Sequence, residues 1–138
     1  MENIIGLILV HPYGTYTARG DKKLIVKSKR FEYMLNTTLV LIENKLILGL
    51  IRCDKMEEMT LKNFKDSKEQ HMINETDRQN WWQNKRTLYG YHISYLKTFK
   101  YPIPIEYPQG PQVFVRYDNI TFMQKILIGT SGYDYKWW

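Results

Sequence analysis

The densest group of chemically active side chains in the sequence is a basic run that follows two tyrosines. The run contains Arg19, Lys22, Lys23, Lys27, Lys29 and Arg30, with Asp21 as its single acid. Cations at this density contact phosphate oxygens and give salt-dependent affinity for nucleic acids. Tyr13 and Tyr16 precede the run, and tyrosine rings can stack on unpaired bases. The pattern predicts a nucleic-acid contact surface; the alternative is a solvated strand face in a lysine-rich protein.

The adjacent residues Trp81 and Trp82 form a second candidate site. Neighbouring positions on a helix point about 100° apart, so one ring can pack in a core while the other turns toward a groove. Arg78 lies one turn before Trp82, which allows a guanidinium–indole contact. Because Trp buries much apolar area, we expect the pair chiefly to fasten its helix to the strand at residues 89–95. Trp82 and Arg78 are the members expected to face a groove.

The histidines are widely separated and do not have the spacing of a zinc site: His11, His71 and His92. The sequence therefore predicts neither a metal nor a cofactor. His11 or His71 could act as an acid or base near neutral pH, although a histidine beside a helix cap more often forms a structural hydrogen bond. A metal-independent ribonuclease could combine Lys27, Ser28 and a histidine. The spacing of these residues does not require that arrangement, so a binding module is favoured over an enzyme.

Length and composition indicate one small, basic domain. A chain of 138 residues with 43% hydrophobic content can build one core, and its net charge of +6 favours an anionic partner such as nucleic acid or an acidic protein surface. Cys53 is the only cysteine, which excludes an internal disulfide and favours a reducing, cytoplasmic setting. The apolar run at residues 4–10 is too short to span a membrane, so no membrane partner is expected.

The elements that must position these side chains are mostly strands. Apolar or alternating runs predict strands at residues 4–10, 24–28, 39–43, 46–52, 88–97 and 113–116, and turn-forming residues fill 11–23. Asn44-Lys45 is the loop of the clearest hairpin. In the strand at 88–97, the face carrying Tyr89, Tyr91, Ile93 and Tyr95 is expected to be buried. Prolines at 102, 104, 108 and 111 suit edge segments and turns.

Two short helices are predicted between the hairpin and the strand at 88–97. Thr60 can cap the first helix, which runs to about residue 67, with Met59 and Phe64 as a hydrophobic staple. Asn74 can cap the second, with Asp77 at the third helical position.

This order of elements, together with four passages, resembles the small PUA-like barrels that include ASCH domains. The passages are HPYGTYTARGDKKLIVKSKRF, LVLIENKLILGLIRC, HMINETDRQNWW and YPQGPQVFV, within residues 4–116. Gly20 and Lys22 match the ASCH signature of Gly, Lys, Glu and Arg, whereas Ile25 and Lys27 stand at the Glu and Arg positions. The resemblance implies an α+β, mainly β, mixed barrel with two short helices inserted mid-chain. Its open groove would bind RNA, or less often DNA or a modified base.

The last residues, KILIGTSGYDYKWW, are similar to the opening strand and loop of the YecE-like domain of unknown function, a larger TIM-barrel-like fold. We expect a barrel domain at residues 1–125 and a tail at 126–138. The tail is either a remnant of a fused neighbour or, through residues 126–129, the last strand of the barrel. A noncatalytic module that recruits a YecE-like partner is the remaining functional alternative.

Overall fold

The computed structural model describes residues 3–107 and 113–118 of the chain. Six strands form one mixed sheet: β1 (Asn3–Ile8), β2 (Leu24–Lys27), β3 (Leu39–Glu43), β4 (Leu46–Met59), β5 (Leu88–Pro104) and β6 (Phe114–Asp118). The helical elements are short: α1 (Tyr13–Ala18), the 3-10 turn η1 (Glu32–Met34), α2 (Leu61–Asp66), α3 (Lys68–His71) and α4 (Glu75–Trp82). The expected α+β, mainly β, architecture is confirmed.

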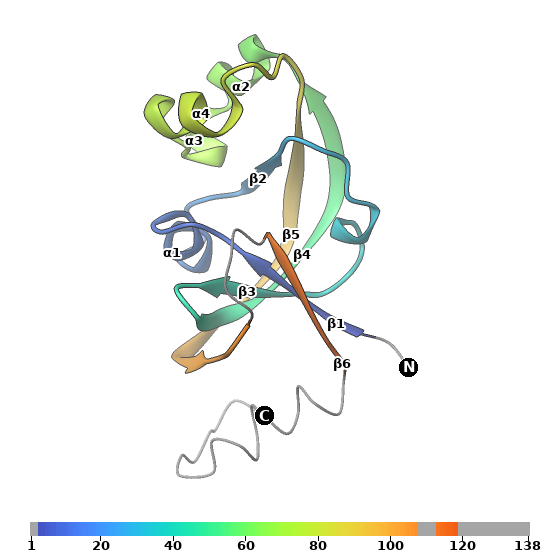
Figure 1. Cartoon of the computed structure of the whole chain (residues 1–138), viewed down its shortest axis with the longest axis vertical. Helices are drawn as coiled ribbons and strands as arrows, with labels where there is room; N and C mark the ends of the chain where they lie inside the picture. The colour runs from blue at the N-terminus through green and yellow to red at the C-terminus, as the bar shows by residue number, and fades with distance from the viewer. Residues whose placement is uncertain (1–2, 108–112, 119–138) are drawn as a thin grey trace.

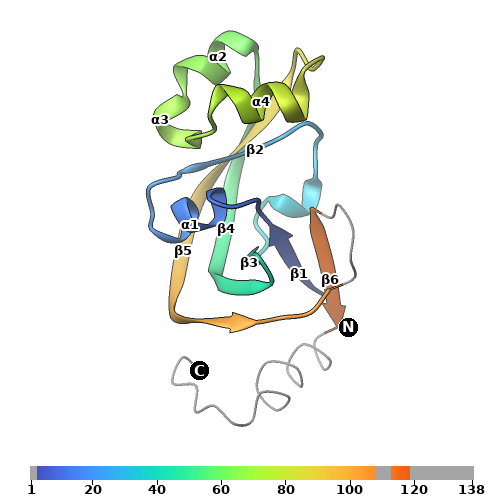
Figure 2. The same ribbon diagram turned by 60° about the vertical axis from the view of Figure 1, so that its left-hand side comes forward.

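The strand order is β2-β5-β4-β3-β1-β6, in which β1 and β3 are parallel and the other pairs are antiparallel. The long strands β4 and β5 run through the molecule, and α2, α3 and α4 gather at one end of them, beyond β2 (Figures 1 and 2). Since β2 and β6 are the two ends of the order, the described strands leave an unpaired seam between them. This seam positions the site described below.

The β3–β4 hairpin forms where the sequence predicts it. Asn44 and Lys45 both have positive φ, 52° and 60°, as a two-residue hairpin turn requires. The prolines of β5 also lie where they can be accommodated. Residues 102–104 extend past the short β2, which pairs only with Tyr89–His92, so this end of β5 pairs with β4 alone.

The two predicted helix caps are confirmed. Thr60 Oγ1 accepts a hydrogen bond from Asn63 N at 3.1 Å, and Asn74 Oδ1 accepts one from Asp77 N at 2.8 Å. Helix α3 follows α2 after a single residue, and the sequence pattern does not predict it.

The interpretation of residues 11–23 as turns is wrong for residues 13–18, which form α1. Its first turn is held by Glu43 from the end of β3. The carboxylate accepts hydrogen bonds from Thr15 N at 3.0 Å and Thr15 Oγ1 at 2.7 Å. A Cβ on Gly14 would lie 2.8 Å from Glu43 Cβ, so only glycine allows this approach.

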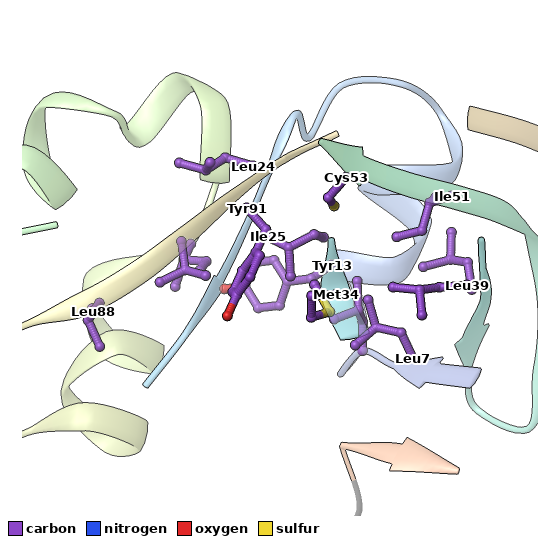
Figure 3. Packing of buried hydrophobic residues seen from close by; sticks show 14 of the residues in the cluster. Leu7, Tyr13, Leu24, Ile25, Met34, Leu39, Ile51, Cys53, Leu88 and Tyr91 are labelled. Atoms are coloured by element: carbon purple, nitrogen blue, oxygen red, sulfur yellow. The ribbon is translucent and has the colours of Figure 1, made fainter. Parts of the chain in front are cut away.

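The main core is formed by side chains from five strands, with Tyr13 of α1 and Met34 of η1 among them (Figure 3). Tyr91 is fully buried there, but Tyr95 on the same predicted face is 47% exposed, which corrects the expectation for that residue. The pairing explains the difference: Cys53 pairs with Ile93 and the preceding Arg52 pairs with Tyr95, so β5 has one extra residue between them. Such a bulge turns the following side chains to the opposite face.

A second cluster packs on the other face of the same sheet, around Ile42, Ile47 and Ile103. Cys53 belongs to the main core, where burial raises the pKa of its thiol to about 12. No helix among the described residues is long and apolar enough to cross a membrane. The tail at 126–138, and the prolines at 108 and 111, lie outside the described residues.

Candidate functional site

A cleft of about 380 Å³ opens at the seam where the sheet does not close. One wall is the β2 edge, with Ile25, Val26 and Lys27. The opposite wall consists of Leu9 and Val10 after β1, and Val113 before β6. Its volume lies in the range of small-molecule pockets, and its lining is mostly apolar with a few polar groups.

Lys22 is the buried cation of this cleft. Its side chain is 3% exposed, its Nζ donates to the carbonyl oxygen of His71, and the same atom lies 5.4 Å from the ring centre of Tyr13. Burial lowers the pKa of Lys22 to about 7, with a further contribution from the charge of Lys27. Near neutral pH this amine is therefore divided between its charged and neutral forms.

Lys27 and Ser28 line the same cleft at the end of β2. Lys27 Nζ lies 5.8 Å from the ring centre of Phe114, and burial lowers the pKa of this lysine to about 8. The two lysines thus bring up to two positive charges into a largely apolar space, where attraction for an anion is stronger than at a solvated surface.

Tyr13 connects α1 to the helical end of the molecule. The phenol is 3% exposed, donates to Asp77 Oδ2 at 2.5 Å and accepts from Asn74 N at 3.2 Å. Burial, and then the hydrogen bond to Asp77, raises the pKa of Tyr13 to about 12, so the phenol stays neutral. These contacts place the start of α4 against the cleft.

Both tryptophans line the cleft. Trp81 is 39% exposed, and its ring lies edge-on to Tyr13 and Trp82 with centroid distances of 5.5 Å and 5.4 Å. Trp82 is half-buried and meets Phe64 edge-on at 6.3 Å. Trp82 packs against the main core, in line with the expected packing role of the pair, although α4 contributes no fully buried residue. The helix is polar, and its rings form a wall.

The predicted basic run divides between the cleft and the surface. Lys22 and Lys27 line the cleft, whereas the exposed members are Arg19, Lys23, Lys29 and Arg30. Arg30 pairs with Glu58 at 2.9 Å and lies over the ring of Tyr89. Tyr16 contacts Tyr13 edge-on at 6.0 Å but does not line the cleft.

Arg78 forms an ion pair with Glu75 at 2.6 Å and does not line the cleft. The guanidinium–indole contact that the spacing allows is not formed among the described residues; the guanidinium instead donates to Glu75, three residues earlier.

The histidines do not line the cleft. His71 is buried, its Nε2 donates to Phe64 O at 2.7 Å, and its Nδ1 accepts from Ile73 N at 2.8 Å. Burial, together with the charge of Lys22, lowers the pKa of His71 to about 4, so the ring is neutral and both nitrogens are engaged. His11 Nδ1 contacts Glu43 at 3.1 Å, and His92 contacts Glu57 at 3.1 Å. In the described part of the chain, no group of three or more His, Cys, Asp or Glu could hold a metal.

Sequence reasoning missed the apolar lining and Trp81. Val10, Phe31 and Ile73 come from three separate segments and have no common spacing that could identify them. A signal for Trp81 does exist in the sequence, because Trp81 adjoins Trp82. The sequence analysis places only Trp82 in a groove, whereas both rings line the cleft.

No protein-family model matches the chain, and no curated protein matches its sequence. The fold is similar to crystal structures of ASCH from Zymomonas mobilis, with a TM-score of 0.70, 9% sequence identity, and coverage of 88% of this chain and 92% of that chain. Two single-substitution variants of the same protein give TM-scores of 0.73 and 0.72, also at 9% identity and 88% coverage of this chain, with 92% and 94% of those chains covered. The chain therefore has an ASCH/PUA-like fold.

Proposed function

We propose that this ASCH/PUA-like chain is an RNA-binding module that receives one unstacked base in the cleft at the sheet seam. The observation that supports the proposal is convergence: Lys22, Lys27, Tyr13 and both tryptophans line one cavity, although they come from separate elements. The sequence alone predicts cations and rings but not their meeting point.

The chemistry of the cleft suits a nucleotide. A base presents a flat apolar face, which the tryptophan wall and the β2 edge can cover, and stacking on aromatic rings tolerates any base. A phosphate brings the negative charge that Lys22 and Lys27 attract. RNA is favoured over duplex DNA because single-stranded loops and ends expose bases that can enter such a cavity.

Anisotropy titrations with a labelled single-stranded RNA, at about 50 and about 200 mM salt, test the proposal. Trp81→Ala should weaken binding about tenfold, because a lost stacking contact costs about 1–3 kcal/mol. The truncation is mild for the fold, since Trp81 is 39% exposed. Tyr95→Ala is the matched control, because this ring is 47% exposed and lies outside the cleft. Salt-insensitive binding, or equal effects of the two variants, would refute the proposal.

A metal-independent ribonuclease is the second candidate, favoured by the presence of Ser28 beside the two lysines in the cleft. Amines with pKa values of about 7 and about 8 have a neutral fraction near neutral pH, and a neutral amine can accept a proton from an attacking hydroxyl. Since neither His11 nor His71 lines the cleft, the lysines are the proton acceptors on this route.

Labelled RNA incubated with the protein and excess chelator separates the two candidates. The ribonuclease predicts chelator-resistant cleavage that Lys27→Ala abolishes and Lys29→Ala retains, because Lys29 is exposed outside the cleft. Measurable binding without any cleavage of the RNA would exclude the ribonuclease and support the binding module.

A further inference from the structure

We propose that a second nucleotide-binding subsite, formed by Tyr33, Phe114 and Arg116, continues the cleft along β6 and takes the nucleotide next to the one in the cleft. The inference rests on the proposed RNA binding, and it adds the course that the strand follows on leaving the cavity. Lys27 of the basic run borders this surface, which is otherwise built from Phe31, η1 and the last described strand.

Three aromatic rings form the floor of the subsite, and they are called the ring cluster here. Phe31 and Phe114 meet at a centroid distance of 4.9 Å, as do Tyr33 and Phe114, and Phe31 and Tyr33 lie 5.8 Å apart. All three rings are half-buried, so each presents part of its surface to solvent while its neighbours hold it in place. A fixed, partly exposed ring is what base stacking requires.

A cation lies at each side of the ring cluster. Lys27 Nζ is 5.8 Å from the ring centre of Phe114, and Arg116 Cζ is 5.3 Å from that of Tyr33. Within residues 3–107 and 113–118, neither cation forms an ion pair with a carboxylate. The acids nearest in the sequence are Glu32, which is exposed in η1, and Asp118 at the end of β6.

The subsite is continuous with the cleft through shared residues. Phe31 and Lys27 line the cleft and also contact Phe114, and Val113, on the opposite wall, directly precedes that ring. Strand alternation then decides which side chains face outward. Val115 and Tyr117 are buried in the second core, whereas Phe114 and Arg116 lie on the other face.

A single-stranded nucleic acid fits this surface better than a protein segment does. Each nucleotide supplies a flat face and a negative charge, and the subsite offers an aromatic ring with a cation over it, Tyr33 with Arg116. The path from Val113 to Arg116 covers about 10 Å of extended strand, which leads the backbone away from the cavity. The chain's net charge of +6 supports the same partner.

Comparing uridine monophosphate, which can fill the cleft alone, with a uridine dinucleotide, which reaches the neighbouring position, tests the subsite in the full chain. The dinucleotide should bind the parent protein more tightly, and Arg116→Gln should remove most of that gain, about five- to tenfold. The same variant should lower the slope of log affinity against log salt by about 0.7, the value for one phosphate contact on a single strand. Tyr33→Leu should reduce the gain without changing the slope. Lys97→Gln is the control, because Lys97 is exposed on β5 away from the ring cluster.

The outcomes separate the two proposals. If Trp81→Ala weakens binding while Arg116→Gln leaves the length gain and the salt slope unchanged, the cleft binds RNA and the subsite is refuted. If the protein binds neither the mononucleotide nor the dinucleotide, both proposals fail. Arg116 is exposed, so its variant should retain the parent circular dichroism spectrum, and a failure to fold is not expected to obscure the result.

Discussion

Replacing Lys22 by methionine should remove a large part of the pH dependence of stability. The side chain is 3% exposed, and burial lowers its pKa from 10.5 to about 7. The unfolded chain therefore holds the Lys22 proton up to about pH 10, whereas the folded chain releases it above about pH 7. Since the unfolded state binds more protons in this window, the free energy of unfolding rises with pH there.

The expected magnitude follows from the width of the window. Each pH unit between the two pKa values contributes up to about 1.4 kcal/mol, so Lys22 adds about 2 kcal/mol between about pH 7 and about pH 9. Lys27, whose pKa is lowered to about 8, adds a smaller amount in the same direction. The thiol of Cys53 opposes both, because its raised pKa favours the unfolded state as pH increases. These two contributions persist in the Lys22→Met variant and cancel in the comparison.

Urea unfolding at the two pH values measures the difference. The parent should gain about 2 kcal/mol more than Lys22→Met on going from about pH 7 to about pH 9. Absolute stability is a less direct readout, because the variant also loses the hydrogen bond from Nζ to the carbonyl of His71. Lys23→Met is the matched control, since this neighbouring lysine is exposed. An equal pH-dependent gain in parent and variant would show that Lys22 is not desolvated as described.

Three further outcomes are expected. Because both cleft lysines lose charge as pH rises through about 7 and about 8, RNA affinity should be greatest below about pH 7 and should fall by pH 9, as anisotropy titrations over this range would measure. Gly14→Ala should lower the free energy of unfolding by about 1–3 kcal/mol, because the new Cβ would stand 2.8 Å from Glu43 Cβ; thermal melts would check this. Tyr13→Phe should lower the free energy of unfolding by about 1–3 kcal/mol, because Asp77 and the Asn74 amide lose their hydrogen bonds to the phenol. The same variant should reduce the change in Trp81 fluorescence on RNA binding, which a fluorescence titration would detect.

Local signals in the sequence identified the elements whose causes are local. The Asn44-Lys45 turn and the caps at Thr60 and Asn74 depend on residues within a few positions of each other, and all three form. Helix α1 depends instead on Glu43, which is distant in sequence and meets the backbone of Thr15 through the tertiary fold. No local pattern in residues 13–18 could reveal that contact.

The candidate site shows the same division. A cluster of cations and the presence of two tryptophans can be read from the sequence, but which lysine is buried cannot. Lys22 and Lys23 are neighbours of identical type, yet one is 3% exposed and the other is exposed to solvent. Lys22 is the buried one because its amine contacts the His71 carbonyl and the Tyr13 ring, which belong to other elements of the fold. The assignment of residues 126–138 to a tail that resembles the start of a YecE-like domain stays a prediction.

Helix α4 has a consequence for the energetics of the cleft. It has no fully buried side chain; its start is held by hydrogen bonds to one phenol, that of Tyr13, and its end by the partly buried Trp82, which packs against the main core. Elements with few buried contacts open locally at a small free-energy cost, so the amides of α4 should exchange with solvent earlier than those of β3, where every residue is buried. A ligand seated against Trp81 binds only the closed form, and its apparent affinity is the intrinsic affinity reduced by the fraction of molecules in which α4 is open. The local stability of α4 therefore contributes to the observed affinity: the more often this helix is open, the weaker the observed binding to the cleft.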